Sequence, residues 1–215
     1  MAKNFGLRSL SVVEPGVPAD EESRRLAAGA DDLLDTIVRF ESLGEALAGF
    51  PVVVTTSSLR GRGRTRSLEL PELSGYLAAA GGGPAAFVFG PERSGLTEDE
   101  LARASACLRL PTDPSFPTMN LSHAVAVVLA AVAAFSGPPA ARPDDEALAP
   151  ASAIEAAVAH WDLALEAIDF YDTGHRDRSL RDWRKLVAAR PLTEREVAIL
   201  RGVANRVLVS LRRRD

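Results

Sequence analysis

Residues 86–135 constrain the fold of this chain more than any other stretch. The stretch holds two short apolar segments, residues 86–89 and 107–110, and each breaks into a loop rich in glycine or proline. Each loop ends where a helix signal begins, and the second is followed by an apolar run that closes at residue 135. Apolar strands that lead through irregular loops into helices are typical of a sheet whose edge holds a small-molecule site.

Strand and helix signals alternate along the first part of the chain. Apolar segments that alternate or are β-branched predict strands at residues 7–13, 35–40, 52–55, 86–89 and 107–110. Helical spacing, proline starts and capping residues predict helices at residues 18–28, 42–47, 71–80, 97–106 and 121–135. Such alternation favours an α/β fold with a mostly parallel sheet and helices on both faces.

The rest of the chain has a different composition. Residues 138–152 are rich in proline, alanine and aspartate, which is typical of a linker. Helical signals then cover residues 153–171, 180–189 and 193–211, which predicts an all-α C-terminal part. The sequence therefore predicts an α/β domain over residues 1–137, a linker over 138–152 and a helical extension over 153–215.

The charge of the chain is unevenly distributed. Its net charge is −4, but residues 171–215 alone carry 12 basic and six acidic residues, a balance of +6. A basic segment on an acidic body predicts a local anionic partner. A solvated helical surface is the alternative interpretation.

Several classes of protein are disfavoured by the sequence. No run of 18 apolar residues and no signal peptide is present, so we expect a cytoplasmic protein without a membrane partner. Cys107 is the only cysteine and the three histidines are scattered, so we expect neither a disulfide nor a metal site. No glycine-rich dinucleotide motif follows a predicted strand, and no P-loop occurs.

Three short motifs occur in order: F-G-P-E-x-x-G-L from residue 89, L-P from residue 110, and M-N-L-S from residue 119. Together they resemble the second and third motifs of the SpoU/TrmH-type RNA ribose 2′-O-methyltransferases, which belong to the knotted SPOUT methyltransferases. This resemblance covers residues 4–137. The tail, with F-Y-D-T-G-H from residue 170 and L-T-E-R-E-V from residue 192, is similar to the helical extension of the TrmJ branch. That branch methylates the ribose at position 32 of the tRNA anticodon loop.

The resemblance implies a C-terminal trefoil knot whose loops hold S-adenosylmethionine in a bent shape. Gly90 would allow the backbone to approach the ligand closely, and Leu110 and Met119 would offer an apolar bed for adenine. Taken one at a time, each position could equally be a strand end or a core residue. The positions implied to bind the cofactor are Thr55, Thr56, Ser57, Gly90, Leu110, Pro117, Thr118 and Met119.

Two polar residues are the candidates for catalysis. The resemblance implies that Glu92 and Asn120 hold the site and position the ribose. The alternatives are a helix cap for Asn120 and a surface turn for Glu92. A ribose 2′-hydroxyl is a very weak acid, so methyl transfer needs a group that deprotonates or polarises it.

Basic residues are the candidates for RNA contact. Arg60, Arg62, Arg64 and Arg66 alternate with small residues and would contact tRNA phosphates, unless this stretch is simply a disordered polar loop. The resemblance also implies a homodimer, to which the helix at residues 121–135 could contribute an interface. Further contacts are predicted from the basic residues of the tail: Arg176, Arg178, Arg181, Arg184, Lys185, Arg212, Arg213 and Arg214.

The first motif of the family has no counterpart here. That motif carries an asparagine and a candidate catalytic arginine before a segment similar to residues 3–7, whereas this sequence begins Met1-Ala2-Lys3. We therefore expect the natural chain to be longer. The alternative is a catalytically inactive RNA-binding protein that keeps the SPOUT fold but lacks the arginine. A related enzyme acting on ribosomal RNA is a third interpretation, which the tail disfavours.

Overall fold

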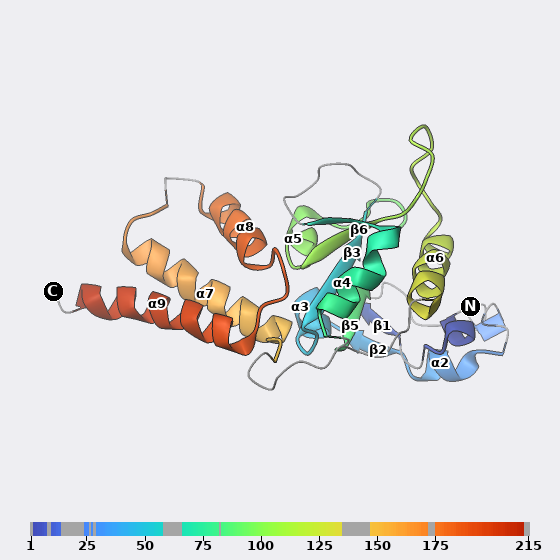
Figure 1. Ribbon diagram of the computed structural model, residues 1–215, viewed down its shortest axis with the longest axis horizontal. Helices are drawn as coiled ribbons and strands as arrows, with labels where there is room; N and C mark the ends of the chain where they lie inside the picture. The colour runs from blue at the N-terminus through green and yellow to red at the C-terminus, as the bar shows by residue number, and fades with distance from the viewer. Residues whose placement is uncertain are drawn as a thin grey trace.

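The computed structural model describes residues 2–7, 10–13, 24–25, 27, 29–57, 66–81, 83–134, 147–171 and 175–212. A central sheet separates the C-terminal helices, on one side of the molecule, from helix α6 and the N-terminal segments on the other (Figure 1). Of the predicted helix at residues 18–28, only residues 24, 25 and 27 are described, and these three are helical.

The central sheet has four parallel strands. They are β3 (Val52–Thr56), β4 (Ser67–Glu69), β5 (Ala85–Val88) and β6 (Ala106–Arg109), in the order β4-β6-β3-β5. The strands β1 (Ser11–Val13) and β2 (Val38–Phe40) pair in parallel in a separate two-stranded sheet. The predicted parallel α/β architecture is confirmed, but the strands form two sheets among the described residues.

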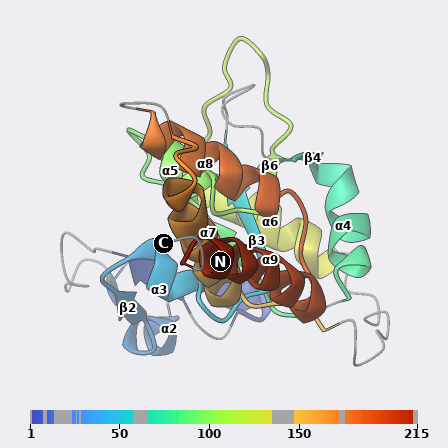
Figure 2. The same ribbon diagram turned by 90° about the vertical axis from the view of Figure 1, so that its left-hand side faces the viewer.

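Helices cover both faces of the central sheet. Val52 and Val54 of β3 pack on one face with helices α4 (Leu73–Ala79) and α6 (Leu121–Ala134). Val53 points to the opposite face and packs with Leu47 of α3 (Leu43–Leu47). Because both faces of the sheet are covered, residues that point to either face are buried, and β3 is therefore a continuous apolar run in the sequence. The view along the long axis shows α3 and α4 on opposite sides of the sheet (Figure 2).

The predicted strand at residues 35–40 is wrong at its start. Residues 31–35 form helix α2 (Asp31–Asp35), whose first turn carries two aspartates, and acidic residues stabilise a helix N-terminus. The helix ends at Thr36, which leaves the helical conformation and donates from its Oγ1 to the carbonyl of Asp32 at 3.0 Å. The N-terminal strand is also shorter than predicted, because a 3₁₀ helix, η1 (Ala2–Phe5), precedes β1.

The predicted helix at residues 97–106 is too long. Helix α5 (Glu98–Leu101) begins with the predicted capping box, in which Thr97 Oγ1 accepts from the N–H of Glu100 at 3.2 Å. The chain then turns, and Ala106 pairs with Val54 as the first residue of β6. Pairing in the sheet overrides the local helical preference of this alanine-rich segment. Strand β4 went unpredicted because it has only three residues.

The C-terminal part consists of helices α7 (Ala151–Ala167), α8 (Arg176–Val187) and α9 (Glu194–Arg212). Helix α7 stops before the predicted residue 171, since Asp169 has a left-handed φ of 53°. Trp161 of α7 donates from its Nε1 to the carbonyl of Leu200 on α9 at 2.9 Å. Its ring lies 5.2 Å from that of Trp183 on α8. These contacts tie the three helices into one cluster.

The C-terminal helices are joined to the α/β part by main-chain hydrogen bonds. The N–H groups of Ala151 and Ser152, in the first turn of α7, donate to the carbonyls of Phe50 and Ala48 at 3.1 Å each. A helix N-terminus has N–H groups without intrahelical partners, and here the segment that follows α3 supplies acceptors for two of them. Residues 147–152, predicted as part of the linker, are therefore hydrogen-bonded, and α7 begins at residue 151.

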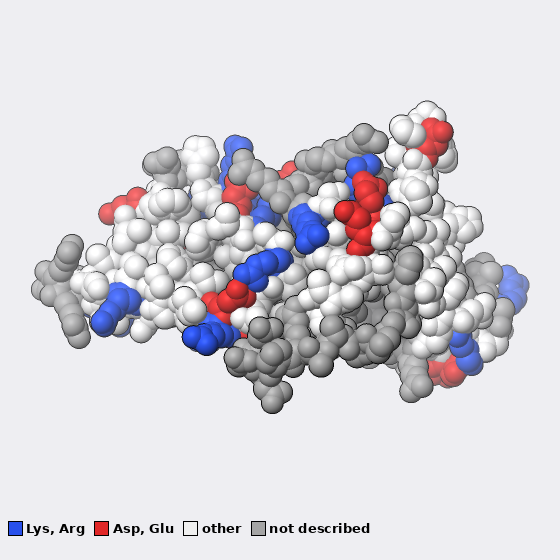
Figure 3. Space-filling view, viewed as in Figure 1, with Lys and Arg blue, Asp and Glu red and all other residues white. Residues whose placement is uncertain are grey.

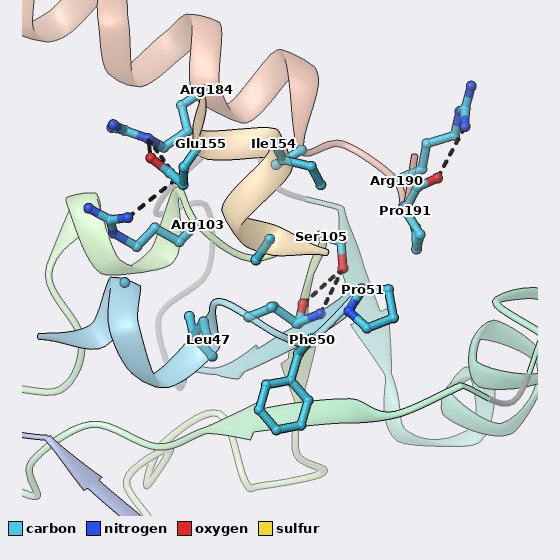
Figure 4. Close-up of a pocket in the computed structure, with 14 residues that line it drawn as sticks. Leu47, Phe50, Pro51, Arg103, Ser105, Ile154, Glu155, Arg184, Arg190 and Pro191 are labelled. Carbon is cyan, nitrogen blue, oxygen red and sulfur yellow. Dashed lines mark hydrogen bonds and ion pairs between the residues drawn. The ribbon is translucent and has the colours of Figure 1, made fainter. Parts of the chain in front are cut away.

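Ion pairs strengthen the same junction (Figure 4). Glu155 of α7 lies between two arginines, with its Oε1 3.3 Å from Arg103 Nη1 and 3.2 Å from Arg184 Nε. A cavity of about 30 Å³ lies beside them, walled mainly by apolar side chains such as Leu47 and Phe50. That volume has room for one or two water molecules, so the cavity is a packing gap and not a substrate site.

The start of α9 gives a testable dependence of stability on pH. Glu196 receives hydrogen bonds from Arg190 and from the N–H of Thr193, which lower its pKa from an ordinary 4.5 to about 2. Because the folded pKa is depressed, the stabilisation is complete above about pH 4.5 and is lost as the pH falls towards 2. Glu196→Gln should therefore cost about 1 kcal/mol of unfolding free energy at pH 7.

Urea unfolding followed by circular dichroism between pH 7 and pH 2 measures this effect. The difference between the wild type and Glu196→Gln should shrink as the pH falls. Glu194→Gln, in the same exposed first turn, is the matched control and should change the unfolding free energy little. A difference that stays constant across this pH range would contradict the assignment.

Candidate active site

A pocket lies where β3, β5 and β6 end. Because parallel strands carry their carboxyl ends at one edge of the sheet, the loops after these strands come together there. The cavity has a volume of about 270 Å³, within the order of small-molecule sites. Its wall consists of Thr56, Ser57, Phe89, Gly90, Pro91, Glu92, Arg93, Ser94, Gly95, Leu96, Leu110, Thr112, Pro117, Thr118, Met119, Leu121 and Ala124.

The loop after β5 folds tightly on itself. The N–H of Gly95 donates to the carbonyl of Pro91 at 2.8 Å, and Gly95 has a φ of 64°, in the left-handed region. A Cβ atom at Gly90 would lie 2.6 Å from both the carbonyl carbon of Gly95 and the nitrogen of Leu96. Only glycine therefore fits at position 90, and its role is the close approach of two backbone segments.

Glu92 and Asn120 meet across 28 residues of sequence. The Nδ2 of Asn120 donates to Glu92 Oε1 at 2.9 Å, and the N–H of Leu121 donates to the same oxygen at 3.2 Å. Asn120 also caps α6, because its Oδ1 accepts from the N–H of Ser122 at 2.9 Å. The carboxylate thus lies at a helix N-terminus, where negative charge is stabilised. Glu92 Oε2 makes no hydrogen bond to any residue that the structure describes.

The structure brings together nearly all the residues predicted to bind a cofactor. Every one of them except Thr55 lines the pocket. Thr55 is fully buried one residue before the end of β3, and its Oγ1 donates to the carbonyl of Ala106 at 3.4 Å. Its hydroxyl is therefore committed within the sheet. That the others bind S-adenosylmethionine stays a prediction.

Sequence reasoning missed one charged residue of the pocket. Arg93 is the only basic residue among the described residues that line it, and its side chain is exposed. It makes no ion pair with any residue that the structure describes. The sequence could have identified Arg93 as a pocket residue, since it lies within the motif F-G-P-E-R-S-G-L. A free cation at this position attracts anionic groups to the pocket.

The predicted arginine loop is described only at its end. Arg60, Arg62 and Arg64 lie outside the described residues. Arg66 is exposed just before β4, with its guanidinium carbon 5.3 Å from the centre of the Tyr76 ring. This cation–π contact holds Arg66 against α4, and the residue does not line the pocket.

Several basic residues of the tail are paired with acids. Arg176 contacts Asp162 at 3.0 Å, and Arg181 lies 3.6 Å from Asp99 of α5. Basic and acidic atoms accordingly lie side by side on the face of the C-terminal helices (Figure 3). Lys185 is buried, with Asp182 at 3.9 Å. The pairs give these residues a structural role, and RNA contact through them stays a prediction.

Other reactive groups do not form a second centre. Among the described residues, no group of three or more His, Cys, Asp or Glu is placed to hold a metal ion. Burial raises the pKa of the Cys107 thiol, which makes it a poor nucleophile at neutral pH. No helix of the described residues is long and apolar enough to cross a membrane.

Two family patterns match the chain. The SpoU rRNA Methylase family matches residues 1–130, which include the pocket loops and most of α6. The C-terminal domain of the tRNA methyltransferase TrmJ matches residues 152–215, which include nearly all of α7 and the whole of α8 and α9.

Named relatives resemble the chain over nearly its whole length. The tRNA (cytidine/uridine-2′-O-)-methyltransferase TrmJ of Klebsiella pneumoniae is 35% identical, with 94% of this chain and 85% of the relative covered. The protein of the same name from Yersinia enterocolitica is 34% identical, covering 99% and 84%. The crystal structure of TrmJ from Z. mobilis superposes with a TM-score of 0.80 at 29% identity, covering 95% of this chain and 89% of the other.

Proposed function

The chain belongs to the SpoU rRNA Methylase family, and from that premise we propose that it is a tRNA ribose 2′-O-methyltransferase. The observation that carries the proposal is the pocket at the ends of β3, β5 and β6, with Glu92 at its wall and Asn120 hydrogen-bonded to Glu92. Two full-length relatives named as tRNA 2′-O-methyltransferases support the substrate class.

We propose S-adenosylmethionine as the methyl donor. The pocket fits such a ligand, because Leu110 and Met119 offer apolar surface while Thr56 and Ser57 supply polar groups. Because Gly90 lines the pocket and has no side chain, a purine edge could approach the main chain there. Bound there, the donor would supply a methyl group already activated as a sulfonium.

Glu92 is proposed to act on the ribose. Its Oε1 is held by Asn120 and by the N-terminus of α6, which fixes the carboxylate in one orientation. Its Oε2 is then free to accept a hydrogen bond from the ribose 2′-hydroxyl and to polarise it. Asn120 is the positioning partner, because its contacts are to Glu92 and to the helix it caps.

The finer features of the proposal rest on the family. Position 32 of the anticodon loop is supported by the TrmJ-type C-terminal part at residues 152–215. A trefoil knot is supported by the sheet order, in which the last strand, β6, lies between the earlier strands β4 and β3.

We also propose that the protein is a cytoplasmic homodimer, with the apolar helix α6 as the interface. Within each chain, we propose an α/β domain at residues 1–137, followed by the linker and the helical extension.

Methyl transfer is tested directly on the full chain. Purified protein is incubated with S-adenosylmethionine carrying a labelled methyl group and an unmodified tRNA transcript. The RNA is then cut with a base-specific ribonuclease to locate the labelled fragment, and that fragment is digested to nucleosides. The expected result is a labelled 2′-O-methylated nucleoside from position 32. Label at another position would refute the site, and no label would refute the activity.

The second candidate shares the fold and the pocket but not the chemical step. A catalytically inactive RNA-binding protein of the same fold would bind both the methyl donor and tRNA in equilibrium assays and would transfer no label. The same incubation therefore distinguishes the two candidates.

A further inference from the structure

The loop between β6 and α6 stands away from the body of the molecule, in both views of the chain (Figure 1, Figure 2). It spans residues 110–120 and contains three prolines, at positions 111, 114 and 117. Thr112, Pro117 and Thr118, on its two arms, line the pocket. The loop therefore rises from the rim of the proposed active site.

Hydrogen bonds form a tight turn at the tip of this loop. Asp113 Oδ1 accepts from the N–H of Ser115 at 2.7 Å and from its hydroxyl at 2.5 Å. The N–H of Phe116 donates to the carbonyl of Asp113 at 3.0 Å. The bonds from Ser115 lower the pKa of the Asp113 carboxyl, because they favour its ionised form. With proline at three positions, the tip loses little conformational freedom on binding a partner.

Phe116 is presented to solvent at this tip. Its exposed fraction is 76%, the largest among the exposed large apolar side chains of the described residues. Phe116 belongs to none of the hydrophobic clusters of the described residues, and in the tip around it only Pro114 and Pro117 are apolar. Figure 3 shows the loop as a narrow lobe. A protein-binding surface has several apolar side chains around such an anchor, so a solitary ring favours a flat partner.

We propose that the ring of Phe116 stacks on an unpaired nucleobase of the RNA, beside the ribose that enters the pocket. This inference rests on the proposed function. Single-stranded RNA is commonly recognised by stacking of splayed bases on aromatic side chains. The exposed Arg93 at the wall of the same pocket supplies a cation for the phosphate backbone. The rim thus offers the two chemistries, an aromatic face and a positive charge, that an RNA loop requires.

Equilibrium binding to an unmodified tRNA transcript tests the stacking. Phe116→Ala should raise the Kd about 5- to 150-fold, the range for loss of one base–aromatic stack. Phe116→Tyr keeps an aromatic face and should bind like the wild type. Phe116→Leu keeps the apolar volume without the aromatic face, so it should bind nearly as weakly as Phe116→Ala. Val38→Ala, which removes a 46% exposed side chain on β2, away from the predicted RNA contacts, is the control and should leave the Kd unchanged.

A second transcript identifies the partner of the ring. This RNA is an anticodon stem–loop with abasic sites next to position 32. The abasic sites should raise the Kd of the wild type by about the same factor by which Phe116→Ala raises the Kd for the intact stem–loop. Phe116→Ala should lose little more on the abasic RNA, since the stack is already absent. If the loss of binding free energy from Phe116→Ala and the loss from the abasic sites add when the two changes are combined, the proposal is overturned.

Three further results would overturn the stacking. They are wild-type affinity in Phe116→Ala, full affinity in Phe116→Leu, and a change of oligomeric state in Phe116→Ala, which would assign the ring to a second copy of the chain. Binding of S-adenosylmethionine, measured by calorimetry, should be unchanged in all variants. If the wild type transfers no methyl group but the Kd pattern holds, the proposed activity fails and the stacking stands.

Discussion

Replacing Gly90 by alanine is expected to weaken binding of S-adenosylmethionine by at least about 100-fold. The new Cβ would lie 2.6 Å from main-chain atoms of Gly95 and Leu96, closer than real Cβ contacts. Main chain cannot rotate away as a side chain can, so the loop after β5 must shift and carry the wall of the pocket with it. Calorimetric titration of the methyl donor into the purified variant measures the loss.

Gly75→Ala is the control for this change. Gly75 lies in α4 with an ordinary φ, and a Cβ atom at this position would meet no other atom within 4 Å. Alanine there should leave ligand binding unchanged and raise stability by about 1 kcal/mol, since glycine weakens helix interiors. Wild-type affinity in Gly90→Ala would show that the loop adapts and that its tight closure does not shape the pocket.

Replacing Asn120 by aspartate should lower methyl transfer at pH 7 by about two to four orders of magnitude. Aspartate keeps an oxygen for the N–H of Ser122, so the cap on α6 survives. It replaces the donor that holds Glu92 Oε1 at 2.9 Å with a second negative charge. Two carboxylates this close raise the pKa of one of them, as in paired acids elsewhere.

The sign of the pH dependence follows from that repulsion. A carboxyl whose folded pKa is raised is destabilising when ionised, so Asn120→Asp should be least stable near neutral pH and should recover as the pH falls through the raised value. Thermal unfolding between pH 5 and pH 8 measures this change in stability, with Asn120→Ala as the uncharged comparison. The double variant Glu92→Gln/Asn120→Asp restores a donor–acceptor pair and should recover the Tm but not the transfer. Equal Tm values for Asn120→Asp at all pH values would show that the two side chains do not couple.

The sequence predicted the elements whose signals are local. Ser42 and Thr97 mark real helix starts through their side-chain caps, and β3 was recognised from its run of β-branched residues. The pattern failed where distant pairing decides. Strand β4 exists because Leu68 pairs with Leu108 of β6, and three residues carry no periodic signal. The separate pairing of β1 with β2 is likewise invisible in either segment alone.

The candidate site shows the same division. Gly90, Glu92 and Asn120 were identified from motifs, and the parallel sheet brings them to one edge. Phe116 escaped notice because its meaning depends on exposure, which composition does not give. The tail arginines looked free in the sequence, yet Arg176 and Arg184 face carboxylates that lie ten or more residues away. Charge counts reveal how much positive charge a segment has, but not how much of it is already neutralised.

The main-chain hydrogen bonds that join the first turn of α7 to the segment after α3 have an evolutionary consequence. The two bonds run from the amide groups of residues 151 and 152 to the carbonyls of Phe50 and Ala48, and so involve no side-chain atom. Mutations can alter the chemistry of these positions while the direction of α7 is inherited unchanged. Proline is the exception, because at residue 151 or 152 it removes a donor. Homologues should therefore exclude proline from residues 151 and 152, even where apolar packing at this junction is met by other side chains.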